Sequence, residues 1–142
     1  MIIKKEAIIL RDIESVFNIV NRVDLYKNFV PHCVESEILS EESDQMIAKL
    51  NFHIKGLSTS FTTKNVVKKY SSIDMQLIEG PFKYLDGKWE FKEIENTTII
   101  FLAIDYKAKN KIIEYGIGKS LEKITNTLVH AFVKEATKQH DK

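Results

Sequence analysis

Residues 110–138 read NKIIEYGIGKSLEKITNTLVHAFVKEATK, a long stretch with helical periodicity near the end of the chain. Apolar residues recur in it every three or four positions, which places them in one stripe on a helix. At about 1.5 Å per residue, the helix is expected to be ~40 Å long. Because an amphipathic helix gains most of its stability from the surface on which it packs, the rest of the chain must provide that surface. The stripe consists of Ile113, Ile117, Leu121, Ile124, Leu128 and Phe132.

Two glycines, Gly116 and Gly118, occupy the first turns of this predicted helix. Each costs about 1 kcal/mol relative to Ala and lets another group approach the backbone closely. One interpretation is a frayed or kinked helix start. The other is a thin place in the helix where a ligand or a gating loop passes.

Composition indicates one ordinary globular domain spanning residues 1–142, since 44% of the residues are hydrophobic and 29% are charged. The formal net charge is only +1, which does not indicate a DNA-binding protein. Cys33 is the single cysteine, which excludes an internal disulfide and a cysteine-cluster metal site. The N-terminal residues lack the pattern of a signal peptide, and no apolar run approaches the ~18 residues of a membrane span. We therefore expect a cytoplasmic protein, at most peripheral to a membrane.

The order of the expected elements indicates an α+β fold. Residues 3–10 are apolar and largely β-branched, which predicts a strand. Asp12 is a favourable N-cap for a short helix, and Asp24 is expected to cap a second one that ends before Pro31. From residue 33 to residue 106 the apolar period becomes two, with turn signals between the runs, which predicts six or seven antiparallel strands. We expect this sheet to curve around the long C-terminal helix.

A sheet that wraps a helix can enclose either a dry core or a pocket. An empty pocket of ~300 Å³ would cost about 7 kcal/mol, which is comparable with the whole stability of a domain. A pocket in this place should therefore be partly collapsed or filled by an apolar ligand. The inward aromatic and flexible residues that suit either interpretation are Phe52, Phe61, Met75, Phe82, Trp89, Phe91 and Tyr106.

Catalytic and metal-binding patterns are weak. The four histidines lack partners at metal-ligand spacing, so we expect no metal site, and Cys33 has no neighbouring base that would make it a nucleophile. Glu79, Asp86 and Glu114 could form an acid and base pair only through the fold. An enzyme remains an open interpretation, and it would need polar side chains with shifted pKa values inside the pocket.

Lysines follow the polar phase of several expected strands. They are a solvated sheet face that discourages edge pairing, or a surface for the phosphates of RNA or of anionic lipid. No aromatic residues interleave with them to stack bases. The lysines that we assign to this phosphate-contacting surface are Lys64, Lys68, Lys69, Lys88 and Lys92.

Two runs of sequence, FHIKGLSTSFTTKN at 52–65 and GPFKYLDGKWEF at 80–91, resemble the coenzyme Q-binding START-domain family of the polyketide cyclase-like, helix-grip superfamily. The resemblance covers nearly the whole chain and departs from the family pattern at His32, Lys64 and Glu135. Further residues that carry it are Tyr26, Phe29, Pro31, Cys33, Ser36, Gly118, Val129, Ala131 and Phe132.

The resemblance implies a helix-grip fold with an apolar tunnel that holds ubiquinone or another lipid and requires no other cofactor. We expect a non-enzymatic quinone carrier or chaperone that supports respiration, with peripheral contact at the cytoplasmic face of the inner membrane. The alternative is a ribosome association toxin that binds the large ribosomal subunit and inhibits translation initiation. Oligomeric state and any antitoxin partner stay open. The residues expected to line the tunnel are Leu50, Phe52, Phe61, Met75, Leu77, Phe82, Trp89, Phe91, Leu102, Ile117, Leu121, Ile124 and Leu128.

Overall fold

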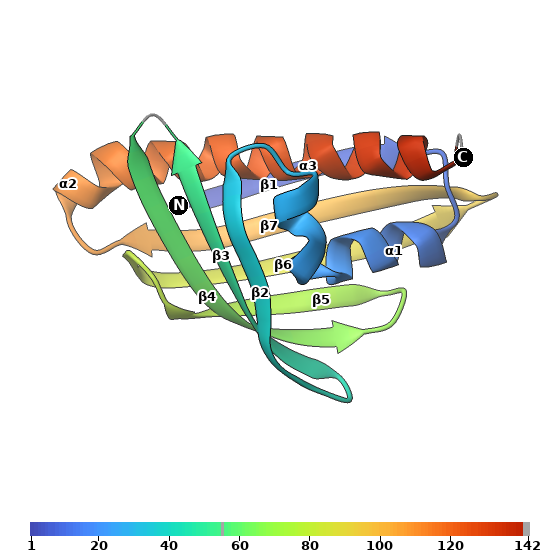
Figure 1. Ribbon diagram of the computed structural model, residues 1–142, viewed down its shortest axis with the longest axis horizontal. Coiled ribbons are helices and arrows are strands. Elements are labelled where there is room, and N and C mark those ends of the chain that lie inside the picture. Colours follow the sequence, from blue (N-terminus) through green and yellow to red (C-terminus); the bar gives the residue numbers. More distant parts are fainter. Residues whose placement is uncertain (55, 141–142) are drawn as a thin grey trace.

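A computed structural model describes residues 1–54 and 56–140, without the side chains of residues 117, 139 and 140. Its seven strands form one antiparallel sheet in the order β1-β7-β6-β5-β4-β3-β2 (Figure 1). The predicted α+β, helix-grip architecture is confirmed, with seven strands and one long C-terminal helix. The strands are β1 (Ile2–Ile9), β2 (Cys33–Glu42), β3 (Gln45–Ile54), β4 (Leu57–Lys68), β5 (Ser72–Glu79), β6 (Phe82–Ile94) and β7 (Thr97–Ala108).

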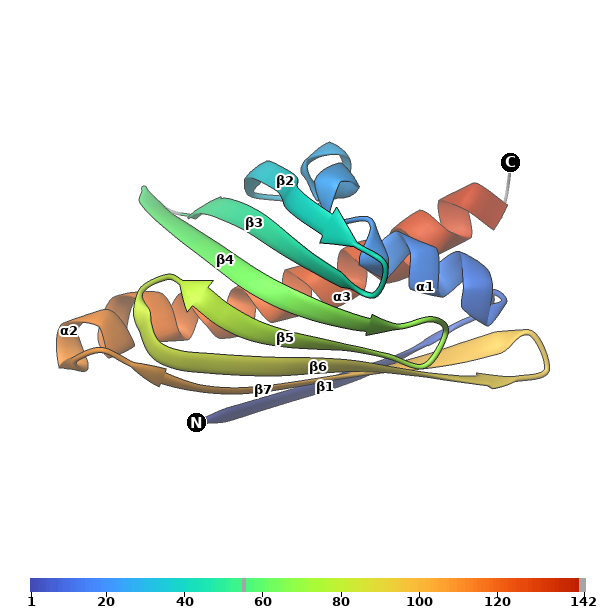
Figure 2. The same ribbon diagram turned by 90° about the horizontal axis from the view of Figure 1, so that it is seen from below.

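The sheet curves around one side of the long helix (Figure 2). Along β6 and β7 buried and more exposed positions alternate, so the inner face carries residues such as Trp89, Ile100 and Leu102. The edge strand β1 packs against the helix and β2 against the short helical segment after α1, so both edges of the sheet are covered.

Four bulges interrupt the regular period of two. The register of each pair places one extra residue on one strand, namely Val34 and Leu39 on β2, Ile78 on β5 and Lys83 on β6. A bulge bends its strand and leaves the extra residue unpaired, which helps the sheet to curve. This explains why Val34, Leu39 and Ile78 are exposed although they are apolar.

Two short helical segments follow β1, as the sequence predicts. Helix α1 (Ile13–Asn21) begins at Asp12, whose side chain accepts a hydrogen bond from the Ser15 amide, so the predicted N-cap is confirmed. The second segment, η1 (Val23–Asn28), is a 3-10 helix without a side-chain cap. The prediction that Asp24 caps this segment is wrong. Asp24 lies in the first turn, and its carboxylate pairs with the Arg22 guanidinium at 2.7 Å.

The C-terminal helix is continuous but irregular at its start. Asn110 caps α2 (Lys111–Ile113), the π-helical turn η2 (Glu114–Gly118) follows, and α3 (Lys119–His140) completes the helix. Both glycines of the predicted helix start lie in this π turn. Single π turns of this kind occur as interruptions inside α-helices. The stripe residues Leu121, Ile124, Leu128 and Phe132 are buried and Ile113 is half-buried, whereas the side chain of Ile117 lies outside the described residues.

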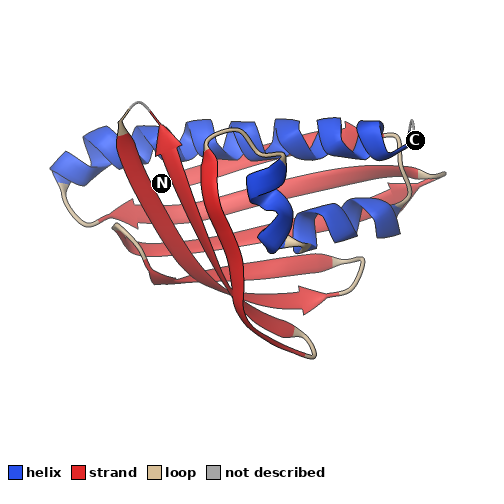
Figure 3. Ribbon diagram, in the orientation of Figure 1, coloured by secondary structure: helices blue, strands red, loops and turns tan. Residues whose placement is uncertain are grey.

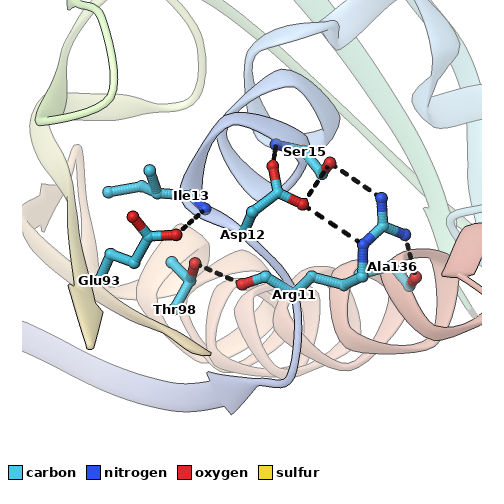
Figure 4. Close-up of polar contacts among 7 residues, drawn as sticks. All are labelled: Arg11, Asp12, Ile13, Ser15, Glu93, Thr98 and Ala136. Carbon is cyan, nitrogen blue, oxygen red and sulfur yellow. Dashed lines mark hydrogen bonds and ion pairs between the residues drawn. The ribbon is translucent and has the colours of Figure 1, made fainter. Parts of the chain in front are cut away.

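Helices α1 and α3 lie on the same side of the sheet (Figure 3) and are joined by Arg11 (Figure 4). Its guanidinium donates to the Ala136 carbonyl at 2.9 Å and to Ser15 Oγ at 2.8 Å, and its carbonyl accepts from Thr98 Oγ1 at 2.8 Å. Glu93 accepts a hydrogen bond from the Ile13 amide at 3.0 Å. These bonds connect the beginning of α1 to α3, β6 and β7 and close this end of the core.

Candidate functional site

A cavity of about 90 Å³ lies between the inner face of the sheet, the α1–η1 segment and α3. Strands β3 to β7 supply one wall, and α3 supplies the opposite wall. Most of the lining is apolar and buried. The lining residues are Val20, Asn21, Val23, Tyr26, Ala48, Leu50, Phe52, Phe61, Thr63, Asn65, Ile73, Met75, Leu85, Trp89, Leu102, Ile104, Leu121, Ile124, Thr125 and Leu128.

Nine of the thirteen expected tunnel residues lie on this wall. They come from the five strands β3 to β7 and from α3. The inward-facing positions predicted from the sequence therefore meet around the same cavity. These nine residues are Leu50, Phe52, Phe61, Met75, Trp89, Leu102, Leu121, Ile124 and Leu128.

Three expected residues do not lie on the wall of this cavity. Phe91 packs edge-on against Phe17 of α1, with ring centroids 5.0 Å apart, because the inner face of β6 runs beyond the cavity. Phe82 stacks behind Phe61 at 5.9 Å. Leu77 packs over the β5–β6 turn, where a Cβ on Gly80 would lie 3.0 Å from Leu77 Cδ1. A fourth residue, Ile117, has a side chain outside the described residues.

Sequence reasoning missed the polar part of the lining. Thr63 and Asn65 continue the inward phase of Phe61 on β4, so periodicity alone could have identified them. Asn21 and Tyr26 belong to the α1–η1 segment, whose position over the sheet depends on tertiary packing. No local pattern in the sequence marks them as cavity residues.

The polar side chains of the lining are uncharged. Thr63 Oγ1 donates to Asn65 Oδ1 at 2.8 Å, which orients the buried carboxamide of Asn65. Asn21 Oδ1 is buried at the cavity and has no hydrogen-bond partner. Thr125 donates to the Glu122 carbonyl, and the Tyr26 hydroxyl donates to the Val20 carbonyl. Burial raises the pKa of Tyr26, so its phenol is a neutral donor at physiological pH.

Met75 gives the wall an adaptable element. It lies opposite Gly87 in the β5–β6 register, and a Cβ on Gly87 would come within 2.7 Å of Met75 Cε. The missing side chain at Gly87 therefore provides the space that the thioether occupies. Because methionine has three rotatable bonds and fills irregular gaps, a change of its rotamer can change the cavity volume.

The small volume of the cavity limits its cost in stability. At ~24 cal/mol per Å³, an empty cavity of about 90 Å³ costs about 2 kcal/mol. Typical ligand pockets measure roughly 300 to 1,000 Å³. The cavity is smaller than such pockets, and its cost is a modest part of the roughly 5 to 15 kcal/mol that stabilises a domain.

A row of three aromatic rings lies beside the cavity at the α2 end of the molecule. Phe61 stacks on Phe82 with an interplanar angle of 9°, and Tyr106 meets Phe82 edge-on at 5.5 Å. These rings come from β4, β6 and β7 and are all buried. Phe61 itself lines the cavity, and Phe82 pairs with Ala108 at the end of β7, just before the C-terminal helix begins.

The five lysines assigned to a phosphate-contacting surface are exposed but are interspersed with acidic residues. Lys88 lies opposite Asp74 in the β5–β6 register. Asp86 and Glu90 lie on the same outer face of β6 as Lys88 and Lys92. The outer face of the sheet therefore carries mixed charge, and Lys64, Lys68 and Lys69 lie apart from Lys88 and Lys92 on β4 and the following turn.

Cys33 is buried at the start of β2, and its thiol contacts the Glu35 carbonyl at 3.5 Å. Burial raises the pKa of Cys33 to about 11, which keeps the thiol protonated near neutral pH. We expect a thiol reagent to modify the native protein at pH 8 at least about tenfold more slowly than the urea-unfolded chain.

The same shift affects stability at high pH. Because the folded state holds the thiol proton more tightly than the unfolded state, its contribution to stability is complete below pH 9.0 and is lost as the pH rises toward about 11. The free energy of unfolding of Cys33→Ala should change less over this interval. Rapid modification of the native thiol at pH 8 would contradict the assignment.

The described lining offers hydrogen bonds, and the one ionisable side chain in it is the neutral phenol of Tyr26. It contains no carboxylate, imidazole, amine or thiol. Over the described part of the chain, no group of three or more His, Cys, Asp or Glu residues is placed to hold a metal ion. Nor does any helix in that part combine the length and the apolar character needed to cross a membrane.

Comparisons with known proteins agree with this geometry. The family profile described as polyketide cyclase / dehydrase and lipid transport matches residues 10–133. Ribosome association toxin RatA of Vibrio cholerae is 32% identical over 135 residues, which cover 94% of each chain. A mitochondrial coenzyme Q-binding protein of Dictyostelium discoideum is 28% identical over 124 residues, 81% of this chain and 60% of the relative. The crystal structure of the ZhuI aromatase/cyclase of Streptomyces superposes with a TM-score of 0.90 at 15% identity and covers 98% of this chain and 94% of that one, which supports the fold alone.

Proposed function

The chain belongs to the polyketide cyclase, dehydrase and lipid transport family, and from this premise we propose that it binds ubiquinone or a related lipid in the cavity between sheet and α3. The observation that carries the proposal is the apolar lining on every side of that cavity, interrupted by a few uncharged polar groups. This is the composition of a site for a mostly apolar ligand with a small polar part. The relative named as a coenzyme Q-binding protein supports the choice of ligand.

Asn65 is the residue best placed to orient the polar part of the ligand. Its Oδ1 accepts from Thr63, so its Nδ2 hydrogens are the groups that donate to a ligand carbonyl. A quinone ring carries carbonyl acceptors, which match such a donor. Asn21 provides a second carboxamide at the wall, and its unpartnered oxygen gains a hydrogen bond from a ligand hydroxyl of the reduced, quinol form.

Binding requires the cavity to expand, since its present volume of about 90 Å³ is smaller than a quinone ring with an isoprenoid tail requires. Met75 is the residue that we expect to move first, because its flexible side chain lies in the space left by Gly87 and is only partly buried. The filled protein then regains the packing contacts that the empty cavity lacks.

We propose that binding proceeds without catalysis. The third interpretation, an enzyme of cyclase or hydrolase type, required titratable side chains with shifted pKa values in the pocket. Among the described lining residues only Tyr26 has a shifted pKa, and the shift holds its phenol in the neutral form with its proton donated to the Val20 carbonyl. Such a group is a poor general base.

The test is uptake of ubiquinone by the full chain, measured by quenching of Trp89 fluorescence, since Trp89 is the only tryptophan and lies on the cavity wall. We expect saturable quenching by ubiquinone with a short isoprenoid chain, and quinone or lipid in an organic extract of natively purified protein. Asn65→Leu should weaken binding of the quinone about five- to tenfold, because one hydrogen bond to a polar ligand is lost. An empty extract together with no quenching would refute the proposal.

A second candidate is association with the large ribosomal subunit, which is favoured by the relatives named RatA at 32 to 33% identity. The mixed charge of the outer sheet face does not offer a continuous basic surface for RNA phosphates. Cosedimentation with large subunits that falls steeply with salt would support this candidate. Uptake of quinone without cosedimentation at low salt would favour the carrier.

A further inference from the structure

Residues 107–119, which we call the basic segment, join the end of β7 to the start of α3 and include α2 and η2. The segment contains four lysines (Lys107, Lys109, Lys111 and Lys119) and one acidic residue, Glu114. Its formal charge is +3, whereas the whole chain carries +1, so the remainder of the chain is net acidic. All four lysines are exposed.

The same segment carries two of the most exposed large apolar side chains in the described structure. Ile112 is 84% exposed and Tyr115 is 74% exposed. They lie three residues apart on a helical path, which makes them neighbours on its surface. Lys119 Nζ lies 5.7 Å from the centre of the Tyr115 ring, so a basic group and an aromatic ring meet on this surface.

The position of the basic segment is also distinctive. Both views show α2 at one extremity of the molecule, at the end opposite the C-terminus (Figures 1 and 2). The segment continues directly from Tyr106, whose ring meets Phe82, and Phe82 in turn stacks on the cavity residue Phe61. A flat surface that meets α2 would therefore lie close to the aromatic row.

We propose that the basic segment docks onto an anionic lipid surface, with Ile112 and Tyr115 in the headgroup layer and the four lysines at the lipid phosphates. Aliphatic and tyrosine side chains gain free energy at the boundary of headgroups and acyl chains, and nearby lysines add electrostatic attraction. An RNA surface would use the lysines but would give Ile112 no apolar environment, which is why a membrane fits the segment better. The proposal goes beyond ligand binding and is independent of which lipid fills the cavity.

The test is cosedimentation of the full chain with vesicles of phosphatidylcholine alone or mixed with phosphatidylglycerol. We expect binding to the mixed vesicles that decreases as salt increases, and little binding to phosphatidylcholine. In Lys109→Gln/Lys111→Gln the partition coefficient should fall about 25-fold, at about fivefold per lysine. In Ile112→Ser/Tyr115→Ser it should fall at least about tenfold, because the apolar contact is lost.

Matched controls separate this surface from general charge and hydrophobicity. Lys64→Gln/Lys68→Gln changes the net charge equally but on β4, and it should lower binding less than about threefold because screening limits distant charges. Leu10→Ser/Ile94→Ser removes exposed apolar residues, 76% and 54% exposed, outside the basic segment and should have no effect. All substituted residues are exposed, so thermal unfolding should be unchanged.

Three results would overturn the proposal: no binding to the mixed vesicles, equal loss in both lysine pairs, or no loss in Ile112→Ser/Tyr115→Ser. Loss of binding to large ribosomal subunits, and not to vesicles, in the Lys109→Gln/Lys111→Gln variant would assign the segment to RNA. Uptake of short-chain ubiquinone from detergent solution should be unaffected in every variant. Failure of docking is therefore distinguishable from failure of quinone binding.

Discussion

Phe132→Ala is expected to lower the free energy of unfolding by about 3 to 5 kcal/mol. Phe132 is 0% exposed and contacts three aromatic rings, those of Tyr26, Phe29 and Trp89, with centroid distances between 5.2 and 6.1 Å. These rings belong to η1, the loop that follows it and β6, so one side chain of α3 holds both the sheet and the short helical segment. Its removal leaves a cavity where three elements meet.

The expected loss is a large part of the roughly 5 to 15 kcal/mol that stabilises a domain. Urea denaturation monitored by circular dichroism measures it, and the thermal midpoint should fall by about 10 to 20 °C. Tyr115→Ala is the matched control, since its ring is exposed, and it should cost less than about 0.5 kcal/mol. A cost below about 1 kcal/mol for Phe132→Ala would show that these rings do not hold α3 in place.

Ala48→Leu is expected to change stability and ligand binding in opposite directions. Ala48 is a small buried residue on the cavity wall, opposite Thr63 in the β3–β4 register. A leucine side chain there fills part of the empty volume and should stabilise the ligand-free protein by up to about 2 kcal/mol. The same carbons occupy space that a quinone ring needs, so affinity for ubiquinone should fall ten- to a hundredfold, corresponding to about 1 to 3 kcal/mol of overpacking.

Ala131→Leu provides the control for this prediction. Ala131 is also buried but does not line the cavity, so leucine there overpacks the core and should destabilise the protein by about 1 to 3 kcal/mol. Its effect on quinone affinity should be small. Thermal unfolding without ligand and Trp89 quenching with ubiquinone measure the two quantities. Undiminished quinone affinity in a stabilised Ala48→Leu protein would place the ligand elsewhere.

The sequence by itself determined the elements and the inner face of the sheet. The period of two in β3, β6 and β7 and the stripe in α3 were sufficient because burial of one face is a local, repeating requirement. For the same reason Thr63 and Asn65 were within reach of sequence reasoning, since they share the phase of Phe61.

Only the tertiary structure decided which inward residues meet around empty space. Phe91 and Trp89 have the same phase on β6, yet Phe91 packs under α1 while Trp89 lines the cavity. The difference arises from where α1 and η1 cross the sheet, and that depends on long-range contacts such as those of Arg11 with Ala136 and Thr98. Periodicity specifies the direction of a side chain, whereas a cavity is defined by the packing of elements that are distant in sequence.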